Sequence, residues 1–351
     1  MLGNVPFAEL ITFTRASPAW RFNASGILVQ DGNNVPRFDY DPVALQARGM
    51  LVEEGRTNYA LWCRDLTNAA WVKTGCTAAK TATGLDGASN AATTLTATAA
   101  NATCLQSITR ASAQRITGLY VRRRAGSGVI NMTQNGGATW TPVMVTGVFT
   151  QVSLPAATAA NPSIGLQIVT SGDAIDVDFV SHEEGAFLTS PILTTTAATA
   201  RSADLGVISD LSEIGFNAIE GTFVVDAQGY QPGAKYSFGV TDGTANNMIG
   251  LSRQSGGILQ SRVTVGGVVA SLGVSSSYAG EQAKVGLTYG QGTHTACMNG
   301  AAVLSIASGV PVVNQMRVGA VTTTGQINGW LRSIRYYPRK LSNAELQALT
   351  T

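Results

Sequence analysis

The residues best suited to chemistry in this sequence are the carboxylates of GDAIDVDFVSHEE, its densest acidic segment. Asp176 and Asp178 are two residues apart, so a strand would place both on one face, with Ile175, Val177 and Phe179 turned to the core. The pair could be a solvated strand face, a Ca²⁺ site completed by a backbone carbonyl, or an acid/base pair. We favour the solvated face and keep Asp176 and Asp178 as the weaker Ca²⁺ candidate.

Nucleophiles and other metal-binding groups are sparse. The chain has two histidines, His182 and His294, and neither stands beside a Ser or Cys motif typical of a hydrolase. The four cysteines show no paired metal-ligand spacing, so no zinc site is expected; whether Cys76 and Cys104 form a disulfide stays open. No glycine-rich phosphate loop precedes a helix. We expect no catalytic residues and no cofactor, with Ca²⁺ as the alternative.

Aromatic side chains beside polar turns are candidates for binding sugars. A flat ring can stack on the apolar face of a pyranose while Asn, Asp and Arg side chains hydrogen-bond its hydroxyls. The candidate rings are Trp140, Tyr230, Tyr236 and Tyr278, and the candidate polar partners are Asp242, Asn246, Asn247 and Arg253. For each ring taken alone, a core or interface role is favoured over sugar binding.

The basic run Arg122-Arg123-Arg124 has two interpretations. Alternate side chains of a strand point to opposite faces, so at most two of the three can share the outer face. A solvated strand end or an interface ion pair is expected. The alternative is bidentate arginine contact with a phosphate-bearing glycan or an acidic protein surface.

The elements that must position these residues are almost all strands. Short β-branched runs at 8–12-residue spacing, joined by Gly-rich turns, are typical of β-sandwiches. Asn299-Gly300 between two alternating runs predicts a hairpin, and LSNAELQAL predicts a C-terminal helix capped by Ser342 or Asn343. The segment LTSPILTTTAATARSAD reads as an extended connection, with a domain boundary near Ser202. The first 58 residues, with several prolines and scattered aromatics, read as an extended arm that packs on another surface.

The composition excludes several classes of function. Charged residues make up 13% of the 351 residues, about half the usual share, and the net charge is +2. A nucleic-acid binder would need a clear basic excess, and disorder is disfavoured by the 44% of hydrophobic residues. No secretory signal and no apolar run long enough for a membrane span is expected.

Three stretches resemble structural proteins of tailed bacteriophages. The leader ITFTRASPAWRFNASGILVQDGNNVPRFDYDP with GMLVEEGRTNYAL is similar to that of tail-fibre, head-fibre and receptor-binding proteins. NAAWVKTG, TGLDGASNAATTL and GDAIDVDFVSHEEGAFLTSPILT resemble carbohydrate-binding-module-like jelly rolls. VGLTYGQGTHTACMNGAAV and INGWLRSIRYYPRKLSNAELQALT resemble the concanavalin-A-like (laminin-G-like) sandwich, but the E-x-D-x-x-E pattern of glucanases with that fold is missing.

The resemblance implies an all-β chain with an anchoring arm (1–58), a carbohydrate-binding-module-like sandwich (59–201) and a concanavalin-A-like sandwich (202–351). It implies a virion protein made in the host bacterial cytoplasm. The implied partners are other virion proteins, two further copies of the chain in a homotrimer, and host polysaccharide or lipopolysaccharide. The anchoring residues would be Phe13, Arg15, Trp20, Arg37, Phe38 and Tyr40. The alternatives are a capsid decoration or tail-structural protein with only virion partners and, third, a polysaccharide depolymerase.

Overall fold

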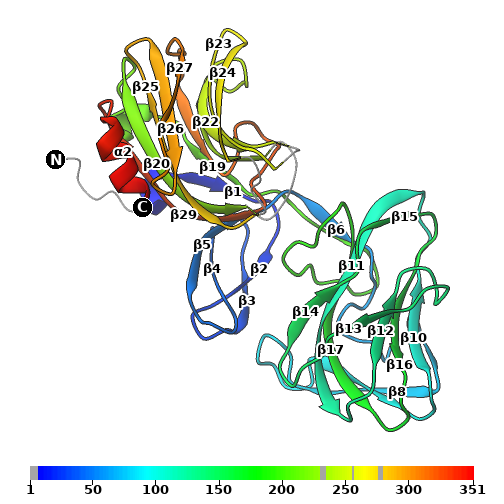
Figure 1. The fold of residues 1–351 in the computed structure, drawn as a ribbon. Helices are drawn as coiled ribbons and strands as arrows, with labels where there is room; N and C mark the ends of the chain where they lie inside the picture. The colour runs from blue at the N-terminus through cyan, green and yellow to red at the C-terminus, as the bar shows by residue number, and fades with distance from the viewer. Residues whose placement is uncertain (1–6, 230–234, 255–256, 276–279) are drawn as a thin grey trace. The chain divides into compact units, whose positions relative to one another are not determined.

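Strands dominate the computed structural model, which describes residues 7–229, 235–254, 257–275 and 280–351 (Figure 1). The chain divides into two compact units. Unit 1 comprises Met1–Pro18, Asp31–Gly55 and Ser202–Thr351, and unit 2 comprises Ala19–Gln30 and Arg56–Arg201. The all-β class predicted from the sequence is confirmed. Within the described ranges, no helix has the length and apolar character needed to cross a membrane.

Unit 1 is a sandwich of two sheets whose neighbouring strands run antiparallel. Among the described residues, each sheet has seven strands. The first sheet has the order β1 (Thr12–Thr14), β19 (Leu205–Ile208), β28 (Gln315–Val318), β21 (Lys235–Thr241), β22 (Met248–Arg253), β23 (Leu259–Val265) and β24 (Val268–Ser275). The second has the order β27 (Leu304–Ala307), β26 (Thr293–Met298), β25 (Gln282–Tyr289), β20 (Gly221–Gly229), β29 (Gly329–Tyr337), β5 (Ala47–Val52) and β4 (Arg37–Tyr40).

The core of unit 1 lies between these two sheets. Phe223 of β20 and Phe238 of β21 are fully buried, and their ring centroids are 4.9 Å apart. Aromatic rings from opposite sheets at this distance close the sandwich and contribute beyond the area that they bury. Short helical segments border it: α1 (Phe7–Leu10) and the 3₁₀ turn η1 (Leu211–Ile214).

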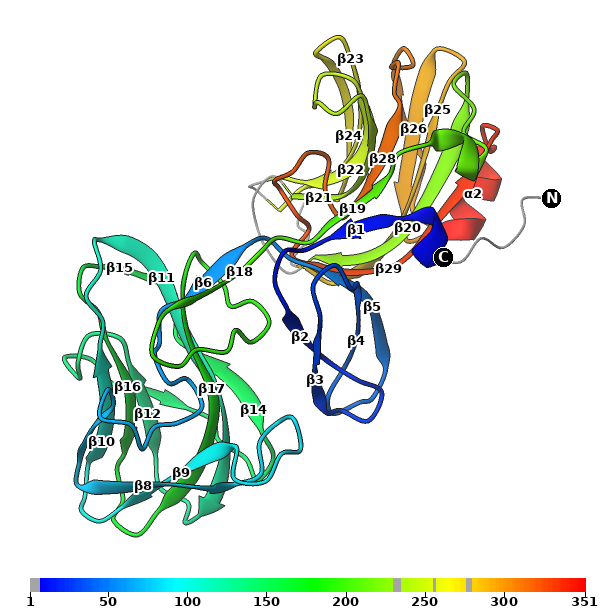
Figure 2. The same ribbon diagram turned by 180° about the vertical axis from the view of Figure 1, so that it is seen from behind.

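The two local predictions for this unit are confirmed. Asn299 and Gly300 form the turn that follows β26 and leads toward β27, with φ of 48° and 72°. A tight hairpin turn needs positive φ at both central positions, and Asn and Gly tolerate it. The helix α2 (Asn343–Thr350) begins after Ser342, whose hydroxyl accepts from the Glu345 backbone N–H, while the Glu345 carboxylate accepts from Ser342 N. Figures 1 and 2 show α2 beside β20 and β25, where Leu346 packs over Gly286.

Unit 2 is a second sandwich. In the part of the chain that the structure describes, one sheet has the order β13 (Thr141–Val143), β12 (Ile130–Thr133), β16 (Ser163–Ile168), β10 (Ala102–Ser107) and β7 (Val72–Thr74). The other has the order β14 (Thr150–Ser153), β11 (Ala113–Ala125), β17 (Ala174–Glu184), β6 (Arg56–Asn58) and β18 (Thr199–Arg201), with β15 (Ala157–Ala159), β8 (Cys76–Ala82) and β9 (Ala92–Ala97) paired beside this path. The hairpin β2 (Ala19–Phe22) and β3 (Leu28–Asp31) supplies Phe22 and Leu28 to the same core.

The cysteines of unit 2 serve as packing residues. Cys63 and Cys104 are buried in its core, and Cys76 is half-buried. All four cysteines of the chain lie in the described ranges and are free, so Cys76 and Cys104 are not joined. Burial raises the pKa of the Cys104 thiol to about 12, which keeps it protonated and unreactive at neutral pH.

The first 58 residues do not form the separate extended arm that their composition predicts. They instead supply β1, β4 and β5 to the sheets of unit 1 and β2, β3 and β6 to unit 2. Of their aromatic side chains, Phe22 is buried, Trp20 and Tyr40 are partly buried, and Phe38 is exposed. The boundary between residues 201 and 202 does coincide with a division between the units.

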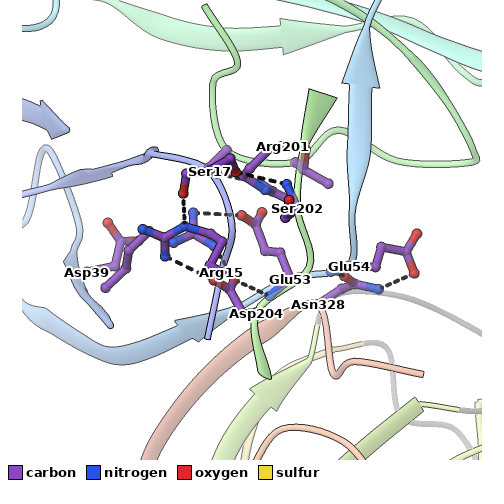
Figure 3. A network of polar contacts seen from close by, with 12 residues as sticks. Arg15, Ser17, Asp39, Glu53, Glu54, Arg201, Ser202, Asp204 and Asn328 are labelled. Atoms are coloured by element: carbon purple, nitrogen blue, oxygen red, sulfur yellow. Dashed lines mark hydrogen bonds and ion pairs between the residues drawn. The ribbon is translucent and has the colours of Figure 1, made fainter. Parts of the chain in front are cut away.

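A buried ion network ties this N-terminal stretch into unit 1 (Figure 3). Arg15 Nη1 lies 3.1 Å from Asp204 Oδ1, Arg37 Nη1 lies 2.9 Å from Glu53 Oε2, and Arg37 also donates to Asp204. The four side chains are at most 1% exposed. Each of these four buried charges therefore has a partner of opposite sign, which is the condition under which such charges are tolerated in a core.

Candidate functional site

The acidic segment is not a solvated strand face, contrary to the prediction. Asp176 and Asp178 are 1% and 0% exposed, because β17 is an interior strand paired with β11 on one side and with β9 and β6 on the other. Asp176 accepts from Arg122 Nε at 2.8 Å and from Thr94 Oγ1 at 2.7 Å. The antiparallel register places Arg122 directly opposite Asp176. The basic run and the acidic segment therefore neutralise each other.

The carboxylates that formed the Ca²⁺ candidate are used in the same way. Asp178 accepts from Arg64 Nε at 2.7 Å and from the Leu85 backbone N–H at 2.9 Å. Both carboxylates are already paired with arginine cations, which would repel a metal ion, so Asp176 and Asp178 do not fit Ca²⁺. Across the described residues, no group of three or more His, Cys, Asp or Glu side chains is arranged to hold a metal.

The five predicted sugar-binding residues that the structure describes in unit 1 lie at the two ends of one hairpin. Tyr236 and Arg253 lie at one end of the β21–β22 hairpin, while Asp242, Asn246 and Asn247 form the loop at its other end. Strand residues advance about 3.3 Å each, so roughly 20 Å of strand separates Tyr236 from Asp242. Trp140 belongs to the other unit. Tyr230 and Tyr278 lie outside the described residues.

The Asp242 loop is a self-contained turn. Asp242 accepts from the Thr244 hydroxyl at 2.7 Å, from the Thr244 backbone N–H at 2.9 Å and from Asn247 Nδ2 at 2.8 Å. These hydrogen bonds lower the pKa of the Asp242 carboxyl, and the one from the Thr244 side chain contributes most. Asn247 Oδ1 accepts from the Gly266 backbone N–H. Asp242 and Asn247 thus stabilise the loop, which leaves the glycan role of this loop an untested prediction.

The anchoring residues divide into buried and accessible ones. Arg15 and Arg37 belong to the buried ion network and Phe13 is 8% exposed, so these three are committed within unit 1. Phe38 is 45% exposed. The other two predicted residues are partly buried: Trp20, which packs edge-on against Phe179, and Tyr40.

A pocket of about 390 Å³ opens at one end of the unit 2 sandwich. Its walls come from both sheets: Arg115 of β11, His182 of β17 and Thr133 of β12, together with the segment 154–159. Toward the middle of the sandwich, the inward positions of β11 are apolar, as Leu119 and Val121 show. At this end they become Arg115 and Thr117, so the core gives way to polar groups and the two sheets enclose space.

The polar groups of the pocket are connected by hydrogen bonds. His182 Nδ1 is 2.8 Å from Thr117 Oγ1, which is 3.2 Å from Gln134 Oε1. Gln134 Nε2 donates to the Pro155 carbonyl at 2.8 Å. Arg115 donates from Nη2 to Glu184 Oε1 at 2.8 Å and from Nη1 to the Ala111 and Ala159 carbonyls. Among the described residues, Arg115 Nε and His182 Nε2 are buried atoms with no hydrogen-bond partner.

The electrostatics of the pocket favour a neutral imidazole. His182 is 1% exposed, and burial lowers its pKa to about 4, with the Arg115 charge acting in the same direction and Glu184 opposing it. The Arg115 charge is itself balanced by Glu184. The pocket therefore presents hydrogen-bonding groups without a net charge at neutral pH.

Sequence reasoning came near this pocket without identifying its central residues. Trp140 was selected for its position beside the turn Asn135-Gly136-Gly137; its ring lies against Gly137, and Asn135 lines the pocket. Arg115 and His182 were missed because they are 67 residues apart and meet only through strand pairing. One sequence signal pointed to these residues. Arg115 and Thr117 alternate with the same two-residue period as Leu119 and Val121 of the same strand, so they share the inward face.

The fold and this pocket define an all-β protein of two sandwiches, one of which carries a polar pocket of ligand size. No family model matches the chain, and no curated protein matches it. It is similar to the solved structure of the CBM40 module of a Ruminococcus gnavus IT-sialidase bound to α2,3-sialyllactose, at 15% identity over 38% of this chain and 84% of that one, with a TM-score of 0.32.

Two further solved structures are similar to parts of the chain. One is a heptameric SAP-like pentraxin from Limulus polyphemus, at 12% identity over 38% of this chain and 70% of that one, with a TM-score of 0.31. The other is mouse laminin α1 chain domains LG4-5, at 9% identity over 67% of this chain and 85% of that one, with a TM-score of 0.30. Similarity at this level leaves the ligand to be argued from the chain's own residues.

Proposed function

We propose that this chain is a non-enzymatic surface protein of a tailed-phage virion that binds host glycan, and that the pocket of unit 2 is its binding site. The observation that carries the glycan proposal is this pocket, whose volume of about 390 Å³ lies within the range of small-molecule sites. Its walls combine small side chains with the unpartnered polar atoms of Arg115 and His182. Such a mixture suits a sugar, which offers many hydroxyls and little apolar surface.

The virion proposal rests on the resemblance of the N-terminal leader and of the two sandwich segments to phage fibre proteins. Attachment to other virion proteins would use accessible residues such as Phe38. Self-association as a homotrimer and a place on the particle surface follow from the same resemblance. This pocket is proposed as a binding site and not as a hydrolytic one, because none of its described lining residues is a carboxylate and the nearby Glu184 is ion-paired with Arg115.

The experiment is binding of the whole protein to a glycan array and to host cells, with location of the chain in the particle by cryo-EM. Ala157 lines the pocket and is exposed, so Ala157→Trp would obstruct the entrance. Ala100, an exposed residue of unit 2 away from the pocket, provides the matched control Ala100→Trp. We expect Ala157→Trp to abolish binding and Ala100→Trp to retain it. Equal binding by both variants would refute the assignment of the site, and absence of the chain from the particle would refute the virion role.

A further inference from the structure

We propose that the pocket of unit 2 selects an uncharged sugar, with His182 Nε2 accepting a hydrogen bond from one ligand hydroxyl and Arg115 Nε donating to another. This inference rests on the proposed function and specifies the ligand class of the same site. It follows from the one arrangement of protons that satisfies the hydrogen bonds around His182.

The first step is the orientation of the Gln134 amide. A proline carbonyl can only accept, so the Gln134 atom 2.8 Å from the Pro155 carbonyl must be the amide nitrogen. The Gln134 Oε1 atom then faces Thr117 Oγ1, 3.2 Å away. The carbonyl of Pro155 therefore determines which end of the amide Thr117 meets.

The second step is the direction of the hydroxyl. Thr117 has one proton, and Gln134 Oε1 can only accept, so Thr117 donates that proton to Gln134. The contact of 2.8 Å between Thr117 Oγ1 and His182 Nδ1 must then be a donation from the imidazole. His182 carries its proton on Nδ1, and Nε2 is left as an unprotonated acceptor.

The third step is the charge. A doubly protonated imidazole is disfavoured by burial and by the nearby Arg115 guanidinium, which bring the pKa to about 4. Arg115 donates from its two terminal nitrogens to Glu184 and to two backbone carbonyls, while Nε has no partner. These two side chains thus offer one acceptor and one donor in a neutral setting.

This combination distinguishes between ligand classes. A hydroxyl both donates and accepts, so adjacent hydroxyls of a sugar can satisfy both atoms. A carboxylate accepts only, so placed against His182 Nε2 it would leave that atom buried without a donor, which costs binding energy. The carboxylate of a uronate would also lose its water in a pocket whose lining arginine, Arg115, is already paired with Glu184. An ammonium group would leave Arg115 Nε unsatisfied and lie close to its guanidinium charge. An uncharged sugar is the class that meets both requirements.

The test is NMR of the whole protein labelled with ¹⁵N-histidine at pH 7. The probes are D-glucose, D-galactose, D-mannose and N-acetyl-D-glucosamine, compared with D-glucuronate, D-galacturonate and inorganic phosphate. We expect His182 to carry its proton on Nδ1, and at least one neutral sugar to shift its Nε2 resonance while that of His294 stays unchanged. His182→Phe should weaken binding of that sugar by about fivefold to tenfold, the loss of one hydrogen bond.

A second variant keeps the proposal testable if His182→Phe does not fold. Gln134→Leu removes the acceptor for Thr117, whose hydroxyl can then donate to Nδ1, so we expect protonated Nε2 to appear in the His182 spectrum. Protonation of Nε2 in the unmodified protein, tighter binding of the uronates or phosphate, or no response of His182 to any neutral sugar would each overturn the inference. If His182→Phe leaves binding to host polysaccharide intact, the inference fails while the proposed function stands. Absence of any glycan binding by the unmodified protein removes both.

Discussion

Asp204→Asn tests whether the buried ion network stabilises unit 1. Asp204 is 0% exposed and accepts from Arg15 Nη1 at 3.1 Å, from Arg37 and from the Glu53 backbone N–H at 2.8 Å. Burial alone would lower the pKa of Arg37, but the charges of Asp204 and Glu53 outweigh it and hold that pKa above its ordinary value. The substitution keeps the side-chain size and removes the buried anion that pairs with both Arg15 and Arg37, so these two guanidinium groups lose their shared carboxylate.

The expected loss follows from the cost of breaking a buried ion pair. Removing one partner of such a pair typically costs about 3–5 kcal/mol, because the remaining charge stays buried without compensation. Domains are usually stable by about 5–15 kcal/mol, so this is a large part of the stability of unit 1. A double variant, Asp204→Asn with Arg15→Met, removes one charge of each sign and should be less destabilised than the sum of the two single variants by about 0.5–3 kcal/mol.

The assay is amide hydrogen exchange followed by mass spectrometry, read on peptides from β20 and β25. These core strands report the unfolding free energy of unit 1 without requiring the whole chain to unfold in one transition. The control is Asp226→Asn, a partly exposed residue that accepts from the Gln282 side chain, which should change stability by no more than about 0.5 kcal/mol. A loss below about 1 kcal/mol for Asp204→Asn, or equal losses for it and the control, would refute the reasoning.

Three further outcomes are expected. Burial is the main cause that lowers the pKa values of His182 and His294 from 6.5 to about 4, so between these pH values the unfolded state binds more protons than the folded state. The free energy of unfolding, measured by denaturant titration, should therefore fall as the pH drops from 6.5 to 4. A profile that stays flat over this range would contradict the prediction. Gly329→Ala places a Cβ 2.0 Å from the Gln228 backbone oxygen and should cost about 1–3 kcal/mol or more by thermal unfolding, whereas Gly32→Ala, with nothing within 4 Å, should be near neutral. Hydrogen bonds from Arg339 and then from Ser342 lower the pKa of the Glu345 carboxyl to about 2. The protection of the α2 backbone amides against hydrogen exchange should therefore be present above pH 4.5 and be lost as the pH falls toward 2. Ser342→Ala should weaken this pH dependence.

Local features of this chain could be predicted from the sequence because short-range sterics and hydrogen bonding decide them. Asn299-Gly300 turns because both residues tolerate positive φ, and Ser342 with Glu345 begins a helix because each side chain accepts from the other's backbone N–H. These signals involve residues within a few positions of one another. They do not depend on what packs against them.

The acidic segment shows where that reasoning ended. Alternation correctly placed Asp176 and Asp178 on the face opposite Val177, but whether that face meets water depends on the covering strands and arginines. Arg64 covers Asp178 from 114 residues away in the sequence, and Arg122 covers Asp176 from 54 residues away. The N-terminal stretch differs from its prediction for the same reason, since Arg15 meets Asp204 across 189 residues.

The sequence by itself determined that this protein is built of short strands, where some of its tight turns lie, and that its C-terminus is a capped helix. Only the tertiary structure decided which strands pair, which charges are buried together, and that Arg115, Thr117, Gln134 and His182 surround one pocket. The physical reason is that backbone preferences act over a few residues, whereas register and burial result from the packing of distant segments. The pocket is a product of strand pairing, and its chemistry depends on a proton arrangement that no single segment contains.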